Sequence, residues 1–226
     1  MKDCVEYLYR IISFQHLVDL FETNKLFFAR PSSWEDPYEK RLMHPKINEV
    51  FGQCWSRRGV SDAMWKIYSP NHFGVRIKVG RSKLLEQLNS AKKESFQYRK
   101  IGKVKYCSAV VIDREYAGIV AGLESTPPVG RALDSLMFKR NAYSYEAETR
   151  VLISSNKVGL EEKGIFLPVS PHDLIESILA DPRMPEAVFA SFKFYLKEKL
   201  KYEGLVSRSR IYDAIEPLSV QRSDEV

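Results

Sequence analysis

Residues 7–30 read YLYRIISFQHLVDLFETNKLFFAR, and this stretch decides the class of the fold. Residues 7–12 have the apolar and aromatic composition of a strand. Ser13 is a suitable N-cap, and the apolar residues after it recur at helical spacing, which predicts a helix over residues 14–24. Residues 25–30 then predict a second strand. The chain therefore begins strand, helix, strand.

The same two patterns continue along the chain. Short apolar or alternating runs predict strands, and apolar stripes at helical spacing predict helices. The predicted strands are residues 53–56, 74–79, 103–107, 145–154, 166–169 and 175–179. The predicted helices are residues 62–68, residues 84–93, parts of residues 113–138, and residues 189–200. Strands and helices alternate without a regular βαβ repeat, which predicts an α+β fold of mixed or antiparallel strands flanked by helices.

Composition fits one domain that spans residues 1–226. The chain has 226 residues, of which 44% are hydrophobic and 28% charged, enough for a core over residues 5–212 with a frayed tail at 217–226. The longest apolar runs are a few residues, against the roughly 20 that cross a bilayer. The N-terminus carries acids where a signal peptide needs a basic start and an apolar centre. We therefore expect a cytoplasmic protein that does not enter a membrane.

The positive charge is concentrated in one segment. The chain has 35 Lys and Arg against 29 Asp and Glu, a net charge of +6. Residues 76–105 hold ten basic and two acidic residues, so this basic segment alone carries +8, and Phe96 and Tyr98 lie within it. Such a segment suits a surface that binds a phosphate backbone and stacks bases, or a solvated helix and loop. On the first interpretation, the nucleic-acid contacts are Lys92, Lys93, Arg99 and Lys100.

Several common catalytic and metal signatures are missing. The sequence has no phosphate-binding P-loop, dinucleotide-binding glycine pattern, zincin helix or nucleophile elbow. Its three cysteines (Cys4, Cys54 and Cys107) and four histidines show no metal-ligand spacing. The sequence predicts no metal site of this kind.

Residues 145–150 read YEAETR and contain the best candidates for chemistry. On a strand, residues two apart point to the same side, so Glu146 and Glu148 would present two carboxylates to one surface, with Arg150 in the same row. Two acids this close repel each other, which favours protonation of one of them or an interaction with a substrate hydroxyl or cation. The alternative is a surface strand whose acids pair with Arg150 or with the basic segment, and two acids at this spacing favour it when no other signal is present.

Three other positions are candidates for a binding site. Trp65 and Tyr68 lie three apart on a predicted helix, where they form either a wall for a flat ring or part of the core. Arg10 lies within an apolar strand and must find a carboxylate, a phosphate or water. Arg30, at the end of the next strand, poses the same question. A structural ion pair is the alternative for both arginines.

Five blocks of the sequence occur in the order of a known pattern. They are LYR (8–10), KLFFARPSSWEDPYE (25–39), CWS (54–56), MWKIYSPNHFGV (64–75) and YEAETR (145–150). Together they resemble an uncharacterised prokaryotic family of unknown function, over about residues 7–153 and more weakly to residue 212. The family usually has Phe-Asn where this chain has Trp34-Glu35.

The order of these blocks in turn resembles ADP-ribosyltransferases, which carry an Arg or His on the first strand, a Ser or Tyr in the middle and a Glu on a late strand. The resemblance implies a similar fold, NAD as substrate and no metal. The residues that it implies for NAD binding are Tyr9, Arg10, Arg30, Ser56, Trp65 and Tyr68. Arg10 would hold a phosphate or ribose of NAD, and Ser56 or Tyr68 would flank the nicotinamide.

The resemblance also implies roles for the two acids. Glu148 would accept a hydrogen bond from the ribose and stabilise the positive charge that develops there, and Glu146 would position the acceptor or act as its base. The acceptor would be RNA, DNA or an acidic protein. By analogy, the chain would be a bacterial toxin or phage-defence effector, restrained by an antitoxin or another regulatory protein.

Two other functions fit the sequence. In a metal-dependent nuclease, Asp36, Glu146 and Glu148 would bind Mg²⁺ and the basic segment would bind nucleic acid. In a non-catalytic module that binds nucleic acid or a protein partner, the two glutamates would be structural.

Overall fold

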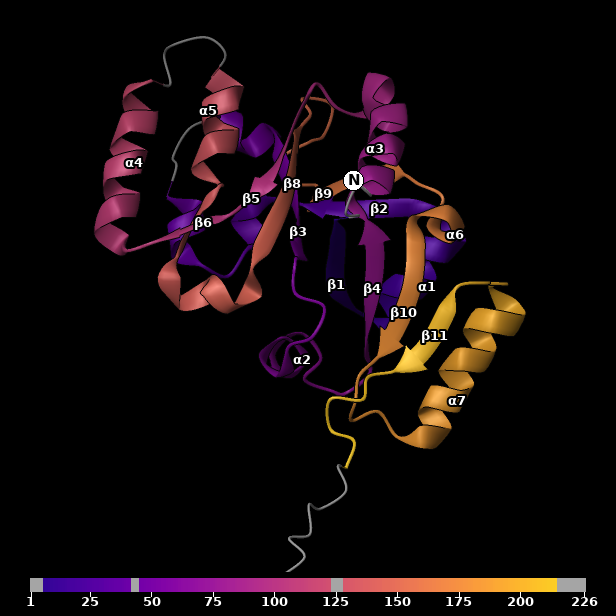
Figure 1. Ribbon diagram of the computed structural model, residues 1–226. Helices are drawn as coiled ribbons and strands as arrows, with labels where there is room; N and C mark the ends of the chain where they lie inside the picture. The colour runs from indigo at the N-terminus through magenta and orange to yellow at the C-terminus, as the bar shows by residue number, and fades with distance from the viewer. Residues whose placement is uncertain (1–5, 42–44, 123–127, 215–226) are drawn as a thin grey trace, which may run out of the picture.

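The structure, a computed structural model, describes residues 6–41, 45–122 and 128–214. It confirms the α+β class. Nine strands form one largely antiparallel sheet with helices packed around it, and two short strands pair separately (Figure 1). Within the described ranges, no helix is long and apolar enough to cross a membrane.

The strands are short and come from the whole length of the chain. They are β1 (Tyr7–Ser13), β2 (Lys25–Ala29), β3 (Val50–Ser56), β4 (Gly74–Gly80), β5 (Tyr98–Lys103), β6 (Lys105–Cys107), β7 (Phe138–Arg140), β8 (Glu148–Ser154), β9 (Gly164–Pro168), β10 (Ile175–Ala180) and β11 (Leu205–Arg208). The helices are α1 (Phe14–Thr23), α2 (Asp62–Tyr68), α3 (Arg81–Ser95), α4 (Ala109–Ala121), α5 (Pro128–Ser135), α6 (Pro171–Leu174) and α7 (Glu186–Phe194). Single turns connect several of them, including the 3₁₀ turns at Pro37–Lys40 and Asn141–Glu146.

The sheet splits beside β3. On one side, β3 pairs with β8 along its whole length, from Val50–Ser154 to Ser56–Glu148. On the other side it has partners only at two points, Ala29 of β2 opposite Gly52 and Tyr9 of β1 opposite Ser56. Figure 1 shows β2 lying across the end of β1 and β4 rather than alongside them. The residues of β3 between these two points therefore face a wedge in the sheet.

The two faces of β3 and β8 belong to two cores, because alternate residues of a strand point to opposite faces. Phe51 and Ile153 pack in the larger core, which also contains the buried residues of α1, β1 and β4. Val50 and Leu152 pack in a smaller core together with residues of α4 and α5. Both cores hold the middle of β8 firmly, so the residue at its start, Glu148, has a fixed position.

The N-terminal prediction is confirmed. The Ser13 side chain accepts a hydrogen bond from the main-chain nitrogen of His16 at 3.1 Å, and Asn24 ends the helix in the left-handed conformation with φ 53°. The strands predicted at 74–79, 166–169 and 175–179 and the helices at 62–68 and 84–93 are also present.

The later part of the chain differs from the prediction in part. The strand predicted at 103–107 begins earlier, at Tyr98, and is divided between β5 and β6. The helix predicted over 189–200 is present as α7 and the π-helical turn Tyr195–Lys199, and it begins three residues earlier, at Glu186. The sequence does not predict β11. β11 pairs with β10 in parallel, a long-range contact that its four residues do not reveal. The tail at 217–226 lies outside the described residues.

Candidate active site

The acidic pair does not lie on one strand, which corrects the prediction from the sequence. Glu146 ends a 3₁₀ turn and Glu148 begins β8, with Ala147 between them in the left-handed conformation at φ 46°. The turn at Ala147 brings both carboxylates to the same amino group. Lys139 Nζ lies 2.5 Å from Glu146 Oε2 and 3.0 Å from Glu148 Oε1. The two acids therefore share a cation.

A buried chain of charges extends from this pair. Arg150 is fully buried; its Nε donates to Glu148 Oε2 at 2.7 Å, and its Nη2 donates to Glu39. Its Nη1 donates to the carbonyl of Leu136 at 2.6 Å. The sequence had predicted a surface row for Arg150, but its guanidinium stacks on Trp34 at 4.6 Å instead. Because each of its three guanidinium nitrogens donates to an acceptor, Arg150 holds Glu148 in one orientation.

The two carboxyl groups differ in acidity. Burial raises the pKa of Glu146 to about 7, and the neighbouring Glu148 adds to that effect. Burial alone would also raise the pKa of Glu148, but Arg150 and Lys139 outweigh it and lower this pKa to about 2. One acid is thus ionised at neutral pH while the other can gain or lose a proton there, a separation typical of acid–base sites.

Two predicted residues hold Glu146 from the opposite side. The Tyr68 hydroxyl, at the last residue of α2, donates to Glu146 Oε1 at 2.9 Å. The Ser56 hydroxyl, at the end of β3, donates to the main-chain carbonyl of Glu146 at 2.7 Å. Tyr68 remains 43% exposed, so the site is open along α2.

A pocket of about 130 Å³ lies among these groups. Its lining includes Tyr9, Arg10, Cys54, Ser56, Met64, Tyr68, Glu146 and Glu148. The structure thus brings together Arg10, Ser56, Tyr68 and the two acids, which are far apart in the sequence. Burial raises the pKa of the Cys54 thiol to about 12, so that thiol is neutral and unreactive.

Arg10 occupies the wedge in the sheet. It lines both the acidic pocket and a larger cavity of about 440 Å³. Burial lowers its pKa, although an arginine stays charged at neutral pH. With the residues that the structure describes, its guanidinium forms no hydrogen bond or ion pair. An unpaired cation in such a place is suited to an anionic ligand.

The cavity of about 440 Å³ has a mixed lining. Its apolar lining residues are Ile12, Leu20, Leu26, Phe27, Ile77 and Phe166, and its polar ones include His16, Asp19, Thr23 and Lys25. The rings of Phe27 and Phe166 lie 4.9 Å apart. This volume and lining are typical of sites for small organic ligands. Arg10 therefore stands between an apolar cavity and an acidic pocket.

Arg30, which had been predicted to bind NAD, lines neither cavity. Its guanidinium donates to the main-chain carbonyls of Asn48, Gly159 and Glu162, at 2.6 Å for Glu162, and lies over the ring of Phe51 at 4.6 Å. Arg30 therefore holds the loop after β8 in place, which corrects the prediction that it binds NAD. Trp65 is 1% exposed and belongs to the packing beneath α2 rather than to the acidic pocket.

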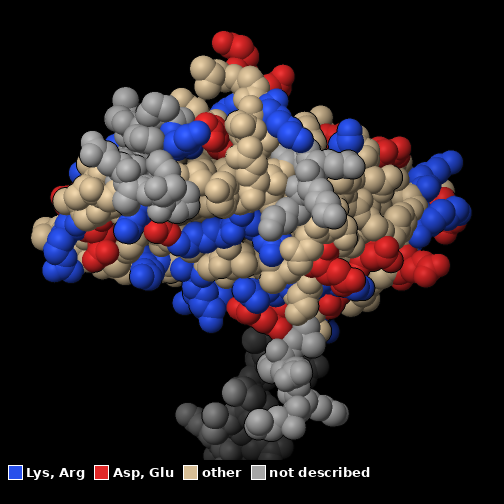
Figure 2. All heavy atoms as spheres, turned by 90° about the horizontal axis from the view of Figure 1, so that it is seen from above, with Lys and Arg blue, Asp and Glu red and all other residues tan. Residues whose placement is uncertain are grey.

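The predicted nucleic-acid residues lie away from the acids. Arg99 and Lys100 on β5 pair with Ile153 and Leu152, near the end of β8 opposite to Glu148. Arg99 donates to the carbonyl of Leu85 at 3.3 Å and Lys100 forms an ion pair with Asp134. Figure 2, which views the molecule from the α3 end, shows basic and acidic side chains interspersed rather than one basic patch. The side chains of Lys92 and Lys93 lie outside the described residues.

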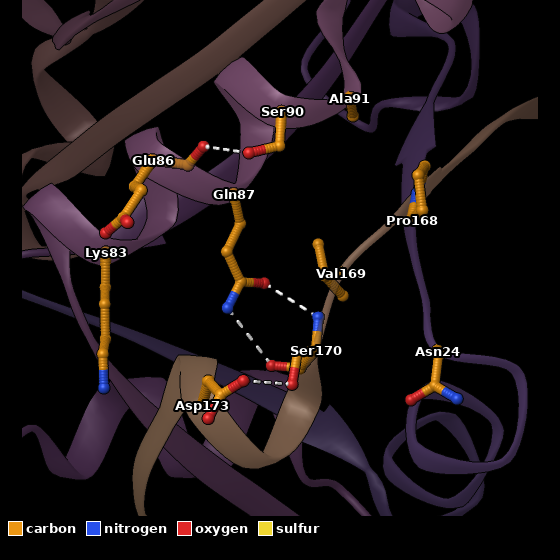
Figure 3. Close-up of a pocket in the computed structure, with 10 residues that line it drawn as sticks. All are labelled: Asn24, Lys83, Glu86, Gln87, Ser90, Ala91, Pro168, Val169, Ser170 and Asp173. Atoms are coloured by element: carbon orange, nitrogen blue, oxygen red, sulfur yellow. Dashed lines mark hydrogen bonds between the residues drawn. The ribbon is translucent and has the colours of Figure 1, made fainter.

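A third cavity, of about 660 Å³, lies between α3 and the chain from β9 to α6 (Figure 3). Its polar groups bind one another: the Gln87 amide is bonded to both main-chain groups of Ser170, and the Ser170 hydroxyl donates to Asp173 at 2.6 Å. It shares no lining residue with the two cavities that Arg10 joins.

The metal-dependent alternative does not gain a ligand set in the described part of the chain. Asp36 forms an ion pair with Arg140 at 2.9 Å and does not line the pocket of Glu146 and Glu148. No group of three or more His, Cys, Asp or Glu is placed to hold a metal ion among the residues that the structure describes.

Lys139, which binds both acids, is not among the residues that the sequence predicts for the site. It lies on β7, a strand of three residues that pairs with β6, and no local pattern distinguishes it from Arg140. The FKR tripeptide offers no signal that one of its cations is buried.

Comparisons with known proteins extend these observations. Residues 64–151, which include Tyr68, Glu146 and Glu148, match the sequence profile of a family described as "Protein of unknown function (DUF2971)". No curated protein matches the chain in sequence.

Solved structures of DarT from Thermus sp. 2.9 resemble the fold loosely, each at 12% identity and over 91% of this chain. The complex with NAD⁺ gives a TM-score of 0.44 over 96% of its chain, and the complex with carba-NAD⁺ gives 0.42 over 96%. The complex with ADP-ribosylated ssDNA gives 0.44 over 94%. A likeness at this level assigns no activity to the chain.

Proposed function

We propose that the protein is an NAD-dependent ADP-ribosyltransferase. The observation that carries the proposal is the position of Arg10, an unpaired cation between an apolar cavity of about 440 Å³ and a pocket that holds one ionised and one titratable carboxyl group. A dinucleotide has the matching order of parts, with an aromatic base, a diphosphate in the middle and a cationic ring on a ribose.

In this proposal the cavity of about 440 Å³ that Arg10 lines binds the adenine end of NAD. The rings of Phe27 and Phe166 offer an apolar surface to the base, and the polar lining residues offer partners for the hydroxyl groups of a ribose. The Arg10 guanidinium then binds the diphosphate, for which its planar donors are well suited. Tyr9 also lines the acidic pocket, next to Arg10.

Glu148 is proposed to stabilise the reacting ribose. Each of its carboxylate oxygens already accepts one protein hydrogen bond and retains a lone pair for a substrate hydroxyl. When the bond between ribose and nicotinamide breaks, the bonding electrons leave with neutral nicotinamide, and positive charge develops on the ribose carbon. A carboxylate fixed by Arg150 and Lys139 stabilises that charge without reorganising.

Glu146 is proposed to accept the proton of the acceptor. An acceptor nitrogen or oxygen bonds to the ribose carbon and loses its proton, which passes to the Glu146 carboxylate. A group with a pKa near 7 is suited to that step. Ser56 and Tyr68 keep Glu146 in place through its main-chain carbonyl and its carboxylate.

Nicotinamide release from NAD tests the proposal. The wild-type protein should release nicotinamide, and Glu148→Gln and Arg10→Ala should abolish or strongly reduce this release. Labelled NAD with separate pools of RNA, single-stranded DNA and protein should then give label in nucleic acid. No release by the wild type, or equal release by Glu148→Gln, would contradict the proposal. Nucleic-acid cleavage that requires no NAD and stops with EDTA would favour the nuclease instead.

An enzyme that modifies nucleic acid inside the cell that makes it needs restraint, so a toxin or phage-defence role with an antitoxin or other regulatory partner belongs to the same proposal. It rests on analogy with the family resemblance and not on a residue of the site. Co-purification of a tagged chain with the product of a neighbouring reading frame would test it.

A further inference from the structure

An arginine next to the acidic pocket lacks a partner for one of its donors. Arg76 lies on β4 opposite Ile11, and its guanidinium stacks on the ring of Tyr9 at 4.9 Å. Its Nε is buried and has no hydrogen-bond partner in the described structure. A buried donor without an acceptor is costly, so its presence points to an acceptor that arrives with a ligand.

Arg58 approaches the same place from the loop between β3 and α2. The loop is fixed to the strands of the site, because the main-chain nitrogen of Arg58 donates to the Ser56 hydroxyl at 3.0 Å and that of Arg57 donates to the carbonyl of Ala147 at 3.0 Å. The Arg58 side chain itself is exposed and has no ion pair with a described residue. A rigid backbone thus carries an unpaired cation.

Both arginines line one narrow depression beside the acidic pocket. Arg10, Arg58 and Arg76 all contribute to it, and no carboxylate does. It shares Tyr9, Arg10, Ile11, Ser56 and Met64 with the lining of the acidic pocket. The depression is therefore electropositive and adjoins the acidic pocket that Glu146 and Glu148 line.

We propose that Arg58 and Arg76 form a phosphate subsite, which binds the backbone of a single-stranded nucleic acid acceptor. This proposal rests on the proposed function and assigns the acceptor a position. Guanidinium groups fit phosphate oxygens with paired donors. A base can reach a buried pocket only when it is out of its stack, which a single strand permits at low cost. The ring of Tyr68, which lines the acidic pocket, is exposed and offers a surface on which such a base could stack.

Binding of a labelled single-stranded DNA oligonucleotide, measured without NAD, tests the subsite. Arg58→Ala and Arg76→Gln should each weaken binding about tenfold, the loss expected for one charge-assisted contact. The slope of log affinity against log salt should fall by about 0.7 for each lost phosphate contact. Arg114→Ala, an exposed arginine on α4, removes the same charge and should leave binding unchanged.

Nicotinamide release without an oligonucleotide separates the two sources of phosphate. It should stay within twofold of wild type in Arg58→Ala and Arg76→Gln if the subsite serves the acceptor. A raised KM for NAD with unchanged oligonucleotide binding would assign the two arginines to the diphosphate of NAD and overturn the proposal. Thermal unfolding checks that Arg76→Gln is still folded. Arg58 is exposed, so Arg58→Ala is not expected to disturb the fold.

Two further results would also overturn it. One is weaker oligonucleotide binding in Arg99→Ala with Lys100→Ala but not in Arg58→Ala or Arg76→Gln. The other is a wild-type protein that binds no single-stranded DNA or RNA and labels only protein. If the wild type releases no nicotinamide but Arg58→Ala and Arg76→Gln lose oligonucleotide binding, the proposed transferase fails while the phosphate subsite stands.

Discussion

The hydroxyl of Tyr68 donates a hydrogen bond of 2.9 Å to Oε1 of Glu146. This bond joins the last residue of α2 to the turn that precedes β8, and it favours the ionised form of Glu146. The pKa of Glu146 therefore depends on the position of the last residue of α2.

A pH profile of ADP-ribosyl transfer should show this dependence. Activity should rise as the pH passes through about 7, because in the proposed reaction Glu146 accepts a proton only after losing its own. Tyr68→Phe removes a donor that stabilises the carboxylate, so the midpoint should move up by about one pH unit. Glu146→Gln should lose the rise altogether. An unchanged midpoint in Tyr68→Phe would mean that another group titrates.

Arg10→Met should separate binding from stability. Arg10 has no protein partner within the described residues, so its removal relieves the burial of a charge. We expect a free energy of unfolding equal to or above that of the wild type, measured by urea denaturation. The KM for NAD should rise at least tenfold through loss of a charge-assisted contact. A clear loss of stability would instead place Arg10 in a structural ion pair.

Glu148→Gln and Glu39→Gln form a matched pair. Both acids bind Arg150, but only Glu148 lines the acidic pocket. Each variant should lose about 3–5 kcal/mol of stability, because it breaks a buried charge pair. Nicotinamide release should fall about 100-fold or more in Glu148→Gln alone, after correction for the folded fraction. Equal losses of activity would reduce Glu148 to a structural role.

Arg183 should act at a distance as a positioning residue. It donates to the carbonyls of Trp65 at 3.0 Å and Ser69 at 2.9 Å, and Asp181 holds it in place. Arg183→Ala should loosen the end of α2 and move the pH midpoint of transfer upward, as Tyr68→Phe does. A loss of stability alone would leave that midpoint unchanged.

Arg208→Ala is the control for this variant. Arg208 donates to Met184 in the same loop but does not contact α2, so its removal should leave the pH midpoint where it is. Arg183→Lys should recover part of the effect, since lysine restores the charge but not the paired donors.

Local rules predicted the local features of the fold. The cap at Ser13 and the apolar stripe of α1 depend on neighbouring residues, and both are present. Arg10 and Arg30 carried the same sequence signal, a cation at an apolar strand. One lies at a cavity and the other is bound by the carbonyls around Gly159 and Glu162. The two arginines differ because the loop after β8 packs against Arg30 and supplies its acceptors, and this long-range contact cannot be read from the residues around Arg30.

The acidic pair shows a different limit of the sequence. The period-two spacing predicts a strand on which Glu146 and Glu148 point to the same side. The two carboxylates do lie together and bind the same cation, Lys139. The left-handed conformation of Ala147, and not a strand, brings them together. Lys139 reaches them from another short strand. The residues next to Lys139 in the sequence do not predict that it is buried, because its partners Glu146 and Glu148 reach it through the tertiary fold.

Among the described residues, β1 pairs with β3 at one position only, Tyr9 opposite Ser56. On one side lie β1, β4, β10 and β11 with Arg10, and on the other lie β3, β8 and β5 with Glu148. The two groups are joined by few main-chain hydrogen bonds, but their side chains share the larger core, which contains Leu8 of β1 and Trp55 of β3. The separation of Arg10 and Glu148, which the proposed reaction requires to match the span of a dinucleotide, is therefore held by side-chain packing rather than by a continuous ladder of strand pairing.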